Sequence, residues 1–174
     1  MRRLRIALTI GALLALMAGP VSAAPASTGD AVKGVGIRLS GFGVQYTISV
    51  KGGPNGPVGS FLYRGVDFRL TFGGPATCFD VVGNEAVIGG CINHVDGMAN
   101  AGLLGQAYLV FVADNGSPSG PGQAGPDVVS QAYILPSDEE SVDVPADFPS
   151  SCPDAATTEH DAYDLQGDIV VRDH

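Results

Sequence analysis

Three histidines are the residues of this 174-residue chain that can offer an imidazole as a general base or metal ligand near neutral pH. His94 stands two residues before Asp96, His160 lies between two acidic residues, and His174 is the last residue given. A metal site needs three or four converging ligands, and the sequence has no His-x-His, His-Glu-x-x-His or Cys-x-x-Cys spacing. The pattern therefore favours histidines in solvated loops, and it predicts no metal centre.

An acid-rich stretch near the C-terminal end could supply the oxygen ligands that Ca²⁺ prefers. It contains Asp138-Glu139-Glu140, Asp143 and Asp147, but not the spaced order of an EF-hand loop. A solvated acidic surface is the favoured interpretation. Binding of Ca²⁺ stays open as an alternative, and no other cofactor is expected.

Hydrolysis by a serine nucleophile has little support in the sequence, which contains no Gly-x-Ser-x-Gly elbow. The glycine-rich stretches are not phosphate-binding loops, since none joins a strand to a helix. A small extracellular hydrolase remains an alternative, with Asp and His residues contributed by separate loops. That hypothesis requires a pocket that gathers His94 and Asp96 with Asp114 or Asp168. The sequence itself identifies no catalytic residue.

The charge balance excludes one class of function and the hydrophobic content excludes another. Nine basic and 18 acidic residues give a formal net charge of −9, which argues against binding nucleic acid through phosphate neutralisation. A hydrophobic fraction of 45% with only 16% charged residues argues against a disordered acidic chain. The length corresponds to one globular domain.

The N-terminal segment has the three parts of a secretory signal peptide. Three arginines within the first five residues precede an apolar run over 6–19, and Val21 and Ala23 fit the small-residue positions of a signal-peptidase site. We therefore expect cleavage between Ala23 and Ala24. The apolar run is shorter than the roughly 20 residues that span a bilayer, so we expect a secreted protein without membrane insertion. The expected organisation is a signal peptide over 1–23, a flexible leader over 24–33 and a single β-domain over 34–174.

Beyond the leader, short apolar alternations separated by Gly and Pro predict strands and little helix. The run over 44–50 alternates apolar and polar residues, as does 66–72, where Phe68, Leu70 and Phe72 share one face. Breaks are expected at 51–57, 73–75 and 117–122, and one short helical turn within 96–104. The expected strands cover 44–50, 59–63, 66–72, 77–82, 85–93, 108–112, 128–135 and 164–173.

About eight strands predict an all-β domain, either a small antiparallel barrel or a β-sandwich. The barrel is favoured because a terminal strand that pairs with the first strand would close the sheet and remove its edges. Six aromatic residues lie in strand patterns and are expected in the core: Phe61, Tyr63, Phe68, Phe72, Tyr108 and Phe111.

Three cysteines allow three single pairings in an exported protein, with one thiol left over. If 82–85 is a hairpin turn, Cys78 faces Gly89, and Cys91 lies diagonally on the same side, where a bridge would strain the ladder. Cys152 stands in a Pro- and Ser-rich stretch that a bridge could hold down. Cys78 with Cys152 is the favoured pair, Cys78 with Cys91 stays open, and a catalytic thiol has less support.

Several segments resemble one group of small secreted bacterial proteins of uncharacterised function. They are Gly59-Ser60-Phe61-Leu62-Tyr63, the run from Thr77 to Gly90 (T-C-x-x-V-x-G-N-x-A-x-I-G-G), Asp114-Asn115-Gly116 and the closing Gly167 to Asp173 (G-D-I-V-V-x-D). Cys91 is an extra thiol outside that pattern. The resemblance implies a β-domain and brings no catalytic residues.

We therefore expect a secreted, non-enzymatic module for extracellular binding or structure, with a cell-surface or small-molecule partner. A barrel that holds a small apolar ligand in an empty interior is the other alternative.

Overall fold

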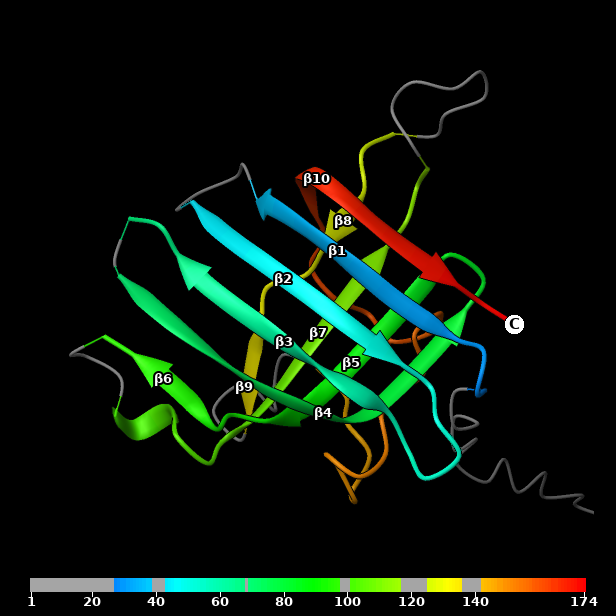
Figure 1. Cartoon of the computed structure of the whole chain (residues 1–174), viewed down its shortest axis with the longest axis horizontal. Coiled ribbons are helices and arrows are strands. Elements are labelled where there is room, and N and C mark those ends of the chain that lie inside the picture. Colours follow the sequence, from blue (N-terminus) through cyan, green and yellow to red (C-terminus); the bar gives the residue numbers. More distant parts are fainter. Residues whose placement is uncertain (1–26, 39–42, 68, 98–100, 117–124, 136–141) are drawn as a thin grey trace, which may run out of the picture.

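The computed structural model shows an all-β chain in which eight strands close into an antiparallel barrel (Figure 1). It describes residues 27–38, 43–67, 69–97, 101–116, 125–135 and 142–174. Around the barrel the order is β1, β2, β3, β4, β5, β7, β8 and β10, and β10 pairs with β1 to complete the ring. The bounds of these strands are β1 Ala31–Arg38, β2 Val44–Lys51, β3 Val58–Gly65, β4 Leu70–Val82, β5 Glu85–Cys91, β7 Ala107–Ala113, β8 Val128–Val129 and β10 Tyr163–Arg172. Two short strands lie off the ring, β6 His94–Asp96 on β4 and β9 Tyr133–Leu135 on β7, and a 3₁₀ turn, η1, covers Ala101–Leu103.

The strands alternate between an inner and an outer face, as their sequences predict. In β2, Val44, Tyr46, Ile48 and Val50 are all buried, whereas the residues between them are less so. This alternation follows from the period of two in an extended chain. One continuous cluster of buried side chains from these inner faces forms the core of the barrel.

Closure of the barrel depends on β1, a strand that the sequence analysis did not identify. Two glycines, Gly34 and Gly36, lie on its inner face and obscure the apolar alternation. A Cβ atom on Gly34 would lie 2.2 Å from the carbonyl oxygen of Asp168 in the paired strand β10, so the glycine permits a close approach of the two strands. Because β1 begins at Ala31, residues 31–33 belong to the sheet and not to the expected leader. The predicted barrel is confirmed, but the strand that pairs with β10 is β1 and not the first predicted strand, 44–50, which is β2 and pairs with β1 and β3.

The long strand β4 passes through the glycine and proline residues at 73–75, so the break expected there is wrong. Up to Pro75 this strand pairs with β3, and from Ala76 it pairs with β5, with an irregular register between Ala76 and Cys78. A Cβ atom on Gly74 would lie 2.0 Å from the carbonyl oxygen of Cys91. The glycines therefore let neighbouring backbones approach where the strand changes partner, and they do not end it. The expected start is also wrong, because Val66 and Asp67 form a turn and β4 begins at Leu70.

The hairpin between β4 and β5 matches the sequence prediction. Val82 pairs with Glu85 across the turn, Gly83 has a φ of 63°, and Cys78 lies opposite Gly89. The disulfide joins Cys78 to Cys152 and leaves Cys91 free, as favoured. A buried disulfide is compatible with an exported protein.

Two aspartates close the seam where β10 has no full-length neighbour. Beyond Asp164, β10 has no ladder partner on this side. The N–H of Leu165 donates to the carbonyl oxygen of Asp127 at 2.8 Å, and carboxylates accept N–H groups further along the strand. Asp127 accepts hydrogen bonds from Ile169 at 2.8 Å and Asn115 at 3.0 Å, and Asp114 accepts one from Val171 at 3.1 Å. These carboxylates accept backbone hydrogen bonds that a neighbouring strand would otherwise accept. Charged acceptors make strong hydrogen bonds to backbone N–H groups.

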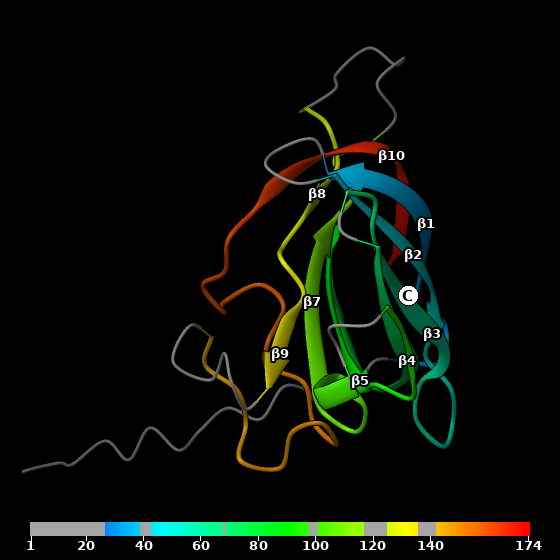
Figure 2. The ribbon, with the colours of Figure 1, turned by 90° about the vertical axis from the view of Figure 1, so that its left-hand side faces the viewer.

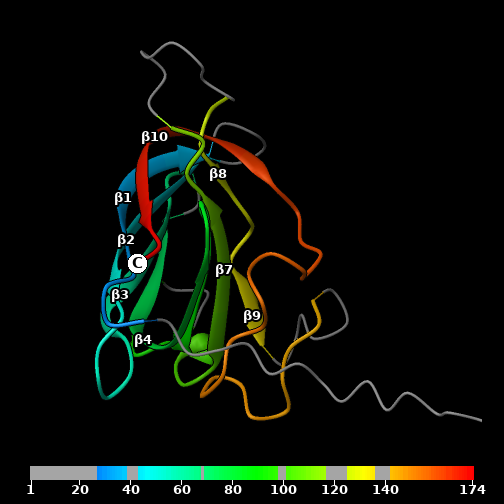
Figure 3. The same cartoon turned by 90° about the vertical axis from the view of Figure 1, so that its right-hand side faces the viewer.

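A second, smaller cluster of buried side chains lies outside the barrel wall. The segment from Val142 to Ala155 covers the outer face of β5, β7 and β9, and Figures 2 and 3 show it as a separate layer beside the barrel. Phe111 lies in this cluster and not in the barrel core, against the ring of Tyr133. The disulfide fastens this outer layer to β4.

Some sequence expectations lie outside the described residues. They concern the signal peptide with the cleavage between Ala23 and Ala24, the loop over 117–122, Phe68, and the acids at 138–140. Within the described part of the chain, no helix has the length and apolar character needed to cross a membrane.

Candidate ligand site at one end of the barrel

Aromatic side chains fill the centre of the barrel. The rings of Phe61 and Tyr108 stack with their centroids 5.0 Å apart, and Phe61 also contacts Tyr46 at 6.0 Å and Phe72 at 6.4 Å. These four residues are at most 3% exposed, which confirms the predicted core positions of Phe61, Phe72 and Tyr108. A ligand in an empty interior therefore has no support at this level of the barrel, and any internal site must lie nearer to an end.

One end of the barrel carries half-buried apolar side chains on its inner rim. It is the end where β1 and β3 finish and where β2, β4 and β10 begin. β6 and η1 also lie there, at the left of Figure 1, and Figure 2 looks toward it. The rim residues pack on the barrel core yet stay partly accessible: Tyr63, Leu70, Val95, Leu103, Ala132 and Ile134.

Arg38 is the basic side chain on the inner face at this end, whereas Arg64 and Arg69 nearby are exposed. Alternation along β1 places it on the inner face with Val32, Gly34 and Gly36, which are the inward positions of the strand. Its guanidinium carbon lies 4.5 Å from the centre of the Tyr163 ring, a cation–π contact. Its Nε is buried and has no hydrogen-bond partner. Lys33, Lys51, Arg64 and Arg172 occupy outward, exposed positions, so Arg38 is the one basic side chain on the inner wall among the strand residues that the structure describes.

Two tyrosines beside Arg38 are neutral and cannot serve as its counterion. Tyr46 is fully buried and donates a hydrogen bond to the carbonyl oxygen of Ser130 at 3.2 Å, and the edge of its ring meets Tyr63 at 5.7 Å. Burial raises the pKa of both phenols, and the nearby charge of Arg38 offsets only part of that rise. Both hydroxyls therefore remain protonated at physiological pH.

Gln106 presents a second polar atom without a partner. Its Oε1 is buried and accepts no hydrogen bond. It precedes β7, where Tyr108 and Val110 are core residues, so alternation puts Gln106 on the inner side as well. Within the described residues, Arg38 Nε and Gln106 Oε1 are the two buried side-chain polar atoms that lack a partner, and native proteins rarely leave such atoms unsatisfied.

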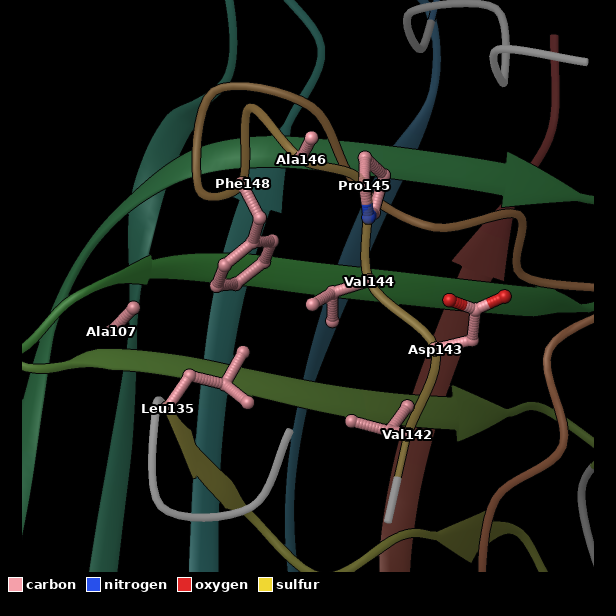
Figure 4. Close-up of a pocket in the computed structure, with 8 residues that line it drawn as sticks. All are labelled: Ala107, Leu135, Val142, Asp143, Val144, Pro145, Ala146 and Phe148. Carbon is pink, nitrogen blue, oxygen red and sulfur yellow. The ribbon is translucent and has the colours of Figure 1, made fainter. Parts of the chain in front are cut away.

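An open groove of about 500 Å³ lies elsewhere, on the outer layer. It is lined by apolar residues from β7, β9 and the 142–148 segment, with Asp143 as the charged member (Figure 4). Phe148 packs toward Leu135 across this groove, while the carboxylate of Asp143 points away from both. The groove offers apolar contact but, in its described lining, a single charged group to orient a ligand.

The residues proposed for hydrolysis do not come together. His94 and Asp96 are exposed on β6, where His94 pairs with Gly73 in the first part of β4. Asp114 lies beyond the opposite end of β4, because its N–H donates to the carbonyl oxygen of Asn84 in the hairpin turn. Asp168 is exposed on β10 and faces away from the core. The pocket that the hydrolase alternative requires is therefore not formed by these four residues.

The other histidines have structural surroundings. His160 stacks on Phe111 with ring centroids 4.2 Å apart, and its Nδ1–H donates to the carbonyl oxygen of Thr158 at 2.9 Å. His174 is exposed, and its backbone N–H donates to Asp30 at 3.0 Å. His160 thus extends the outer cluster and is not a free loop residue as expected.

The acid-rich stretch gives no cation site in the described region. Asp147 accepts a hydrogen bond from the hydroxyl of Ser151 at 2.6 Å, and Asp143 lies at the groove. Over the described ranges, no three His, Cys, Asp or Glu side chains gather closely enough to hold a metal ion.

Arg38 and Gln106 are the site residues that the sequence analysis missed. The available signal was the alternation Val32-x-Gly34-x-Gly36-x-Arg38, which ends in one of the few basic residues of an acidic chain. Comparisons with known proteins add no name to this site: no family model, no curated protein and no solved structure matches the chain.

Proposed function

We propose that this protein is a secreted, non-enzymatic binding module that holds a small molecule at the end of its barrel where β1 finishes. The observation that carries the proposal is Arg38, an inward cationic side chain with a buried Nε that has no partner. A buried donor without a partner costs about 1–3 kcal/mol. Because this atom is buried when no ligand is bound, a molecule must shift the Arg38 side chain to accept its hydrogen bond, and such a contact would recover that cost.

The surroundings of Arg38 support a ligand site with a few polar groups in an apolar setting. The rim supplies apolar and aromatic surface. Gln106, on the inner side before β7, carries the other buried side-chain polar atom that lacks a partner among the described residues. Small-molecule sites combine such a mostly apolar lining with a few placed polar groups, and the mouths of β-barrels are a frequent place for them.

Titration of the mature protein with Nile red, an uncharged apolar fluorophore, tests the location of the site. We expect saturable binding to the wild-type protein. Ala132→Trp fills the barrel rim and should weaken the affinity at least tenfold. Ala146→Trp is the matched control, because it adds the same bulk to the outer groove and should leave the affinity unchanged.

Two results would overturn the proposal. One is the absence of saturable binding to the wild-type protein. The other is loss of binding in Ala146→Trp but not in Ala132→Trp, which would place the site in the outer groove. Leu103→Trp, on the 3₁₀ turn at the same rim, replaces Ala132→Trp if circular dichroism shows that the latter does not fold.

A further inference from the structure

The charge of Arg38 specifies the ligand more narrowly than the proposed function does. We propose that the molecule held at the barrel mouth is a small carboxylic acid, whose carboxylate pairs with Arg38 while an apolar, planar body lies against the tyrosines of the rim. This inference rests on the proposed function and names its ligand class.

The lack of an internal counterion supports an anionic ligand. The chain has 18 acidic and nine basic residues, yet no carboxylate among the described residues pairs with the guanidinium of Arg38. The neighbouring tyrosines are neutral, and Tyr163 offers only the face of its ring. The chain has two acidic residues for every basic one, yet none of the described carboxylates lies against this inward arginine. Its guanidinium is therefore available to an anion from outside the protein.

The ligand should carry one negative charge. Arg38 is the one cation on the described inner wall, and the acidic surface of the rest of the chain repels additional negative charge. A guanidinium also matches the planar, two-oxygen geometry of a carboxylate.

The neighbouring side chains indicate what the body of the acid contacts. Tyr63 stacks on Phe72 with centroids 4.5 Å apart, and Tyr163 lies against the guanidinium. Aromatic faces at the rim favour a flat apolar group, since offset stacking adds to the gain from burial.

A pair of probes that differ only in charge provides the test. Naphthalene-2-carboxylate and naphthalene-2-carboxamide share size, shape and planarity, and their affinities for the mature protein are measured by isothermal titration calorimetry. We expect the carboxylate to bind at least tenfold more tightly than the carboxamide. Arg38→Gln should abolish that preference, and Arg38→Lys should retain part of it.

Arg64→Gln is the matched control, because Arg64 lies on the outer face of β3 and its loss removes the same charge from the chain. It should keep the tenfold preference. Equal affinities of the two probes for the wild-type protein would overturn the carboxylate assignment, even if Arg38→Gln does not fold. So would a preference that survives in Arg38→Gln or disappears in Arg64→Gln.

The outcomes also separate this inference from the proposed function. If both probes bind equally well and Ala132→Trp abolishes the binding of both, the barrel mouth remains the ligand site and only the carboxylate is refuted. If neither probe nor Nile red binds, both proposals fail.

Discussion

Removal of the disulfide should destabilise the protein by several kcal/mol. The bridge joins Cys78 to Cys152 across a sequence separation of 74 residues. In the chain-entropy model a loop of this size costs the cross-linked unfolded chain roughly 15 cal/mol/K, which is about 4.5 kcal/mol of native-state stability at 25 °C. Cys78→Ala with Cys152→Ala should lower the free energy of unfolding by about that amount, a large part of the ~5–15 kcal/mol typical of domains.

Equilibrium unfolding in urea, followed by far-ultraviolet circular dichroism, measures this loss. With a slope of about 2 kcal/mol/M, the midpoint should fall by roughly 2 M. Cys91→Ala is the control, since it removes the free thiol and leaves the bridge intact, and its midpoint should stay within about 0.5 M of the wild type.

Hydrogen exchange should show where the loss is concentrated. The segment from Val142 to Ala155 packs on the outside of the barrel wall and depends on the bridge, whereas the barrel has its own continuous core. In the double variant, β2 and β7 should lose protection only in step with the global free energy of unfolding, whereas this segment should open locally and lose far more of its protection. A loss of stability below about 1 kcal/mol, or uniform loss of protection, would refute the picture of an outer layer fastened by the disulfide to an independent barrel.

Three further changes probe the barrel itself, each with urea unfolding as the measurement. Tyr108→Phe leaves a buried β4 carbonyl without the hydrogen bond that it accepts at 3.1 Å and should cost about 1–2 kcal/mol, so an unchanged midpoint would contradict that bond. Gly59→Ala should cost about 2 kcal/mol more than Gly56→Ala. Both positions have positive φ, but a Cβ on Gly59 would lie 1.9 Å from a carbonyl oxygen of β2, and one on Gly56 meets nothing within 4 Å; equal losses would refute this. Burial raises the pKa of Asp127, so its stabilising contribution is complete below the unfolded-state pKa and is lost as the pH rises through the folded-state pKa. The stability of the wild type relative to Asp127→Asn should therefore increase on acidification from pH 7 to 4, and a decrease would show a lowered pKa.

Local turn chemistry and alternation were sufficient for much of the framework. The hairpin at 82–85 and the pairing of Cys78 with Gly89 follow from a two-residue turn that needs a positive φ at Gly83. The strand over 44–50 follows from its alternation. These features depend on residues close together in the chain, so the sequence contains the information for them.

Glycines within strands caused the main errors. Gly34 and Gly36 hid the apolar alternation of β1, and Gly73 and Gly74 suggested a break inside β4. In each case the glycine serves a neighbouring strand that comes close in space. Such a glycine leaves room for a strand that is distant in the sequence. The residues next to it in the chain therefore do not reveal which strand that is.

By itself, the sequence determined the all-β class and most of the strands, because alternation and turn residues act over short distances. It favoured the Cys78–Cys152 disulfide but left Cys78–Cys91 open, because the bridge joins residues 74 positions apart. Only the tertiary structure decided that Arg38 points into one end of the barrel, beside tyrosines from β2, β3 and β10, and that His94 and Asp114 lie at opposite ends of β4. The physical reason is closure: the ring brings together residues more than 100 positions apart, and which side chains meet depends on strand order and register, which no single strand encodes.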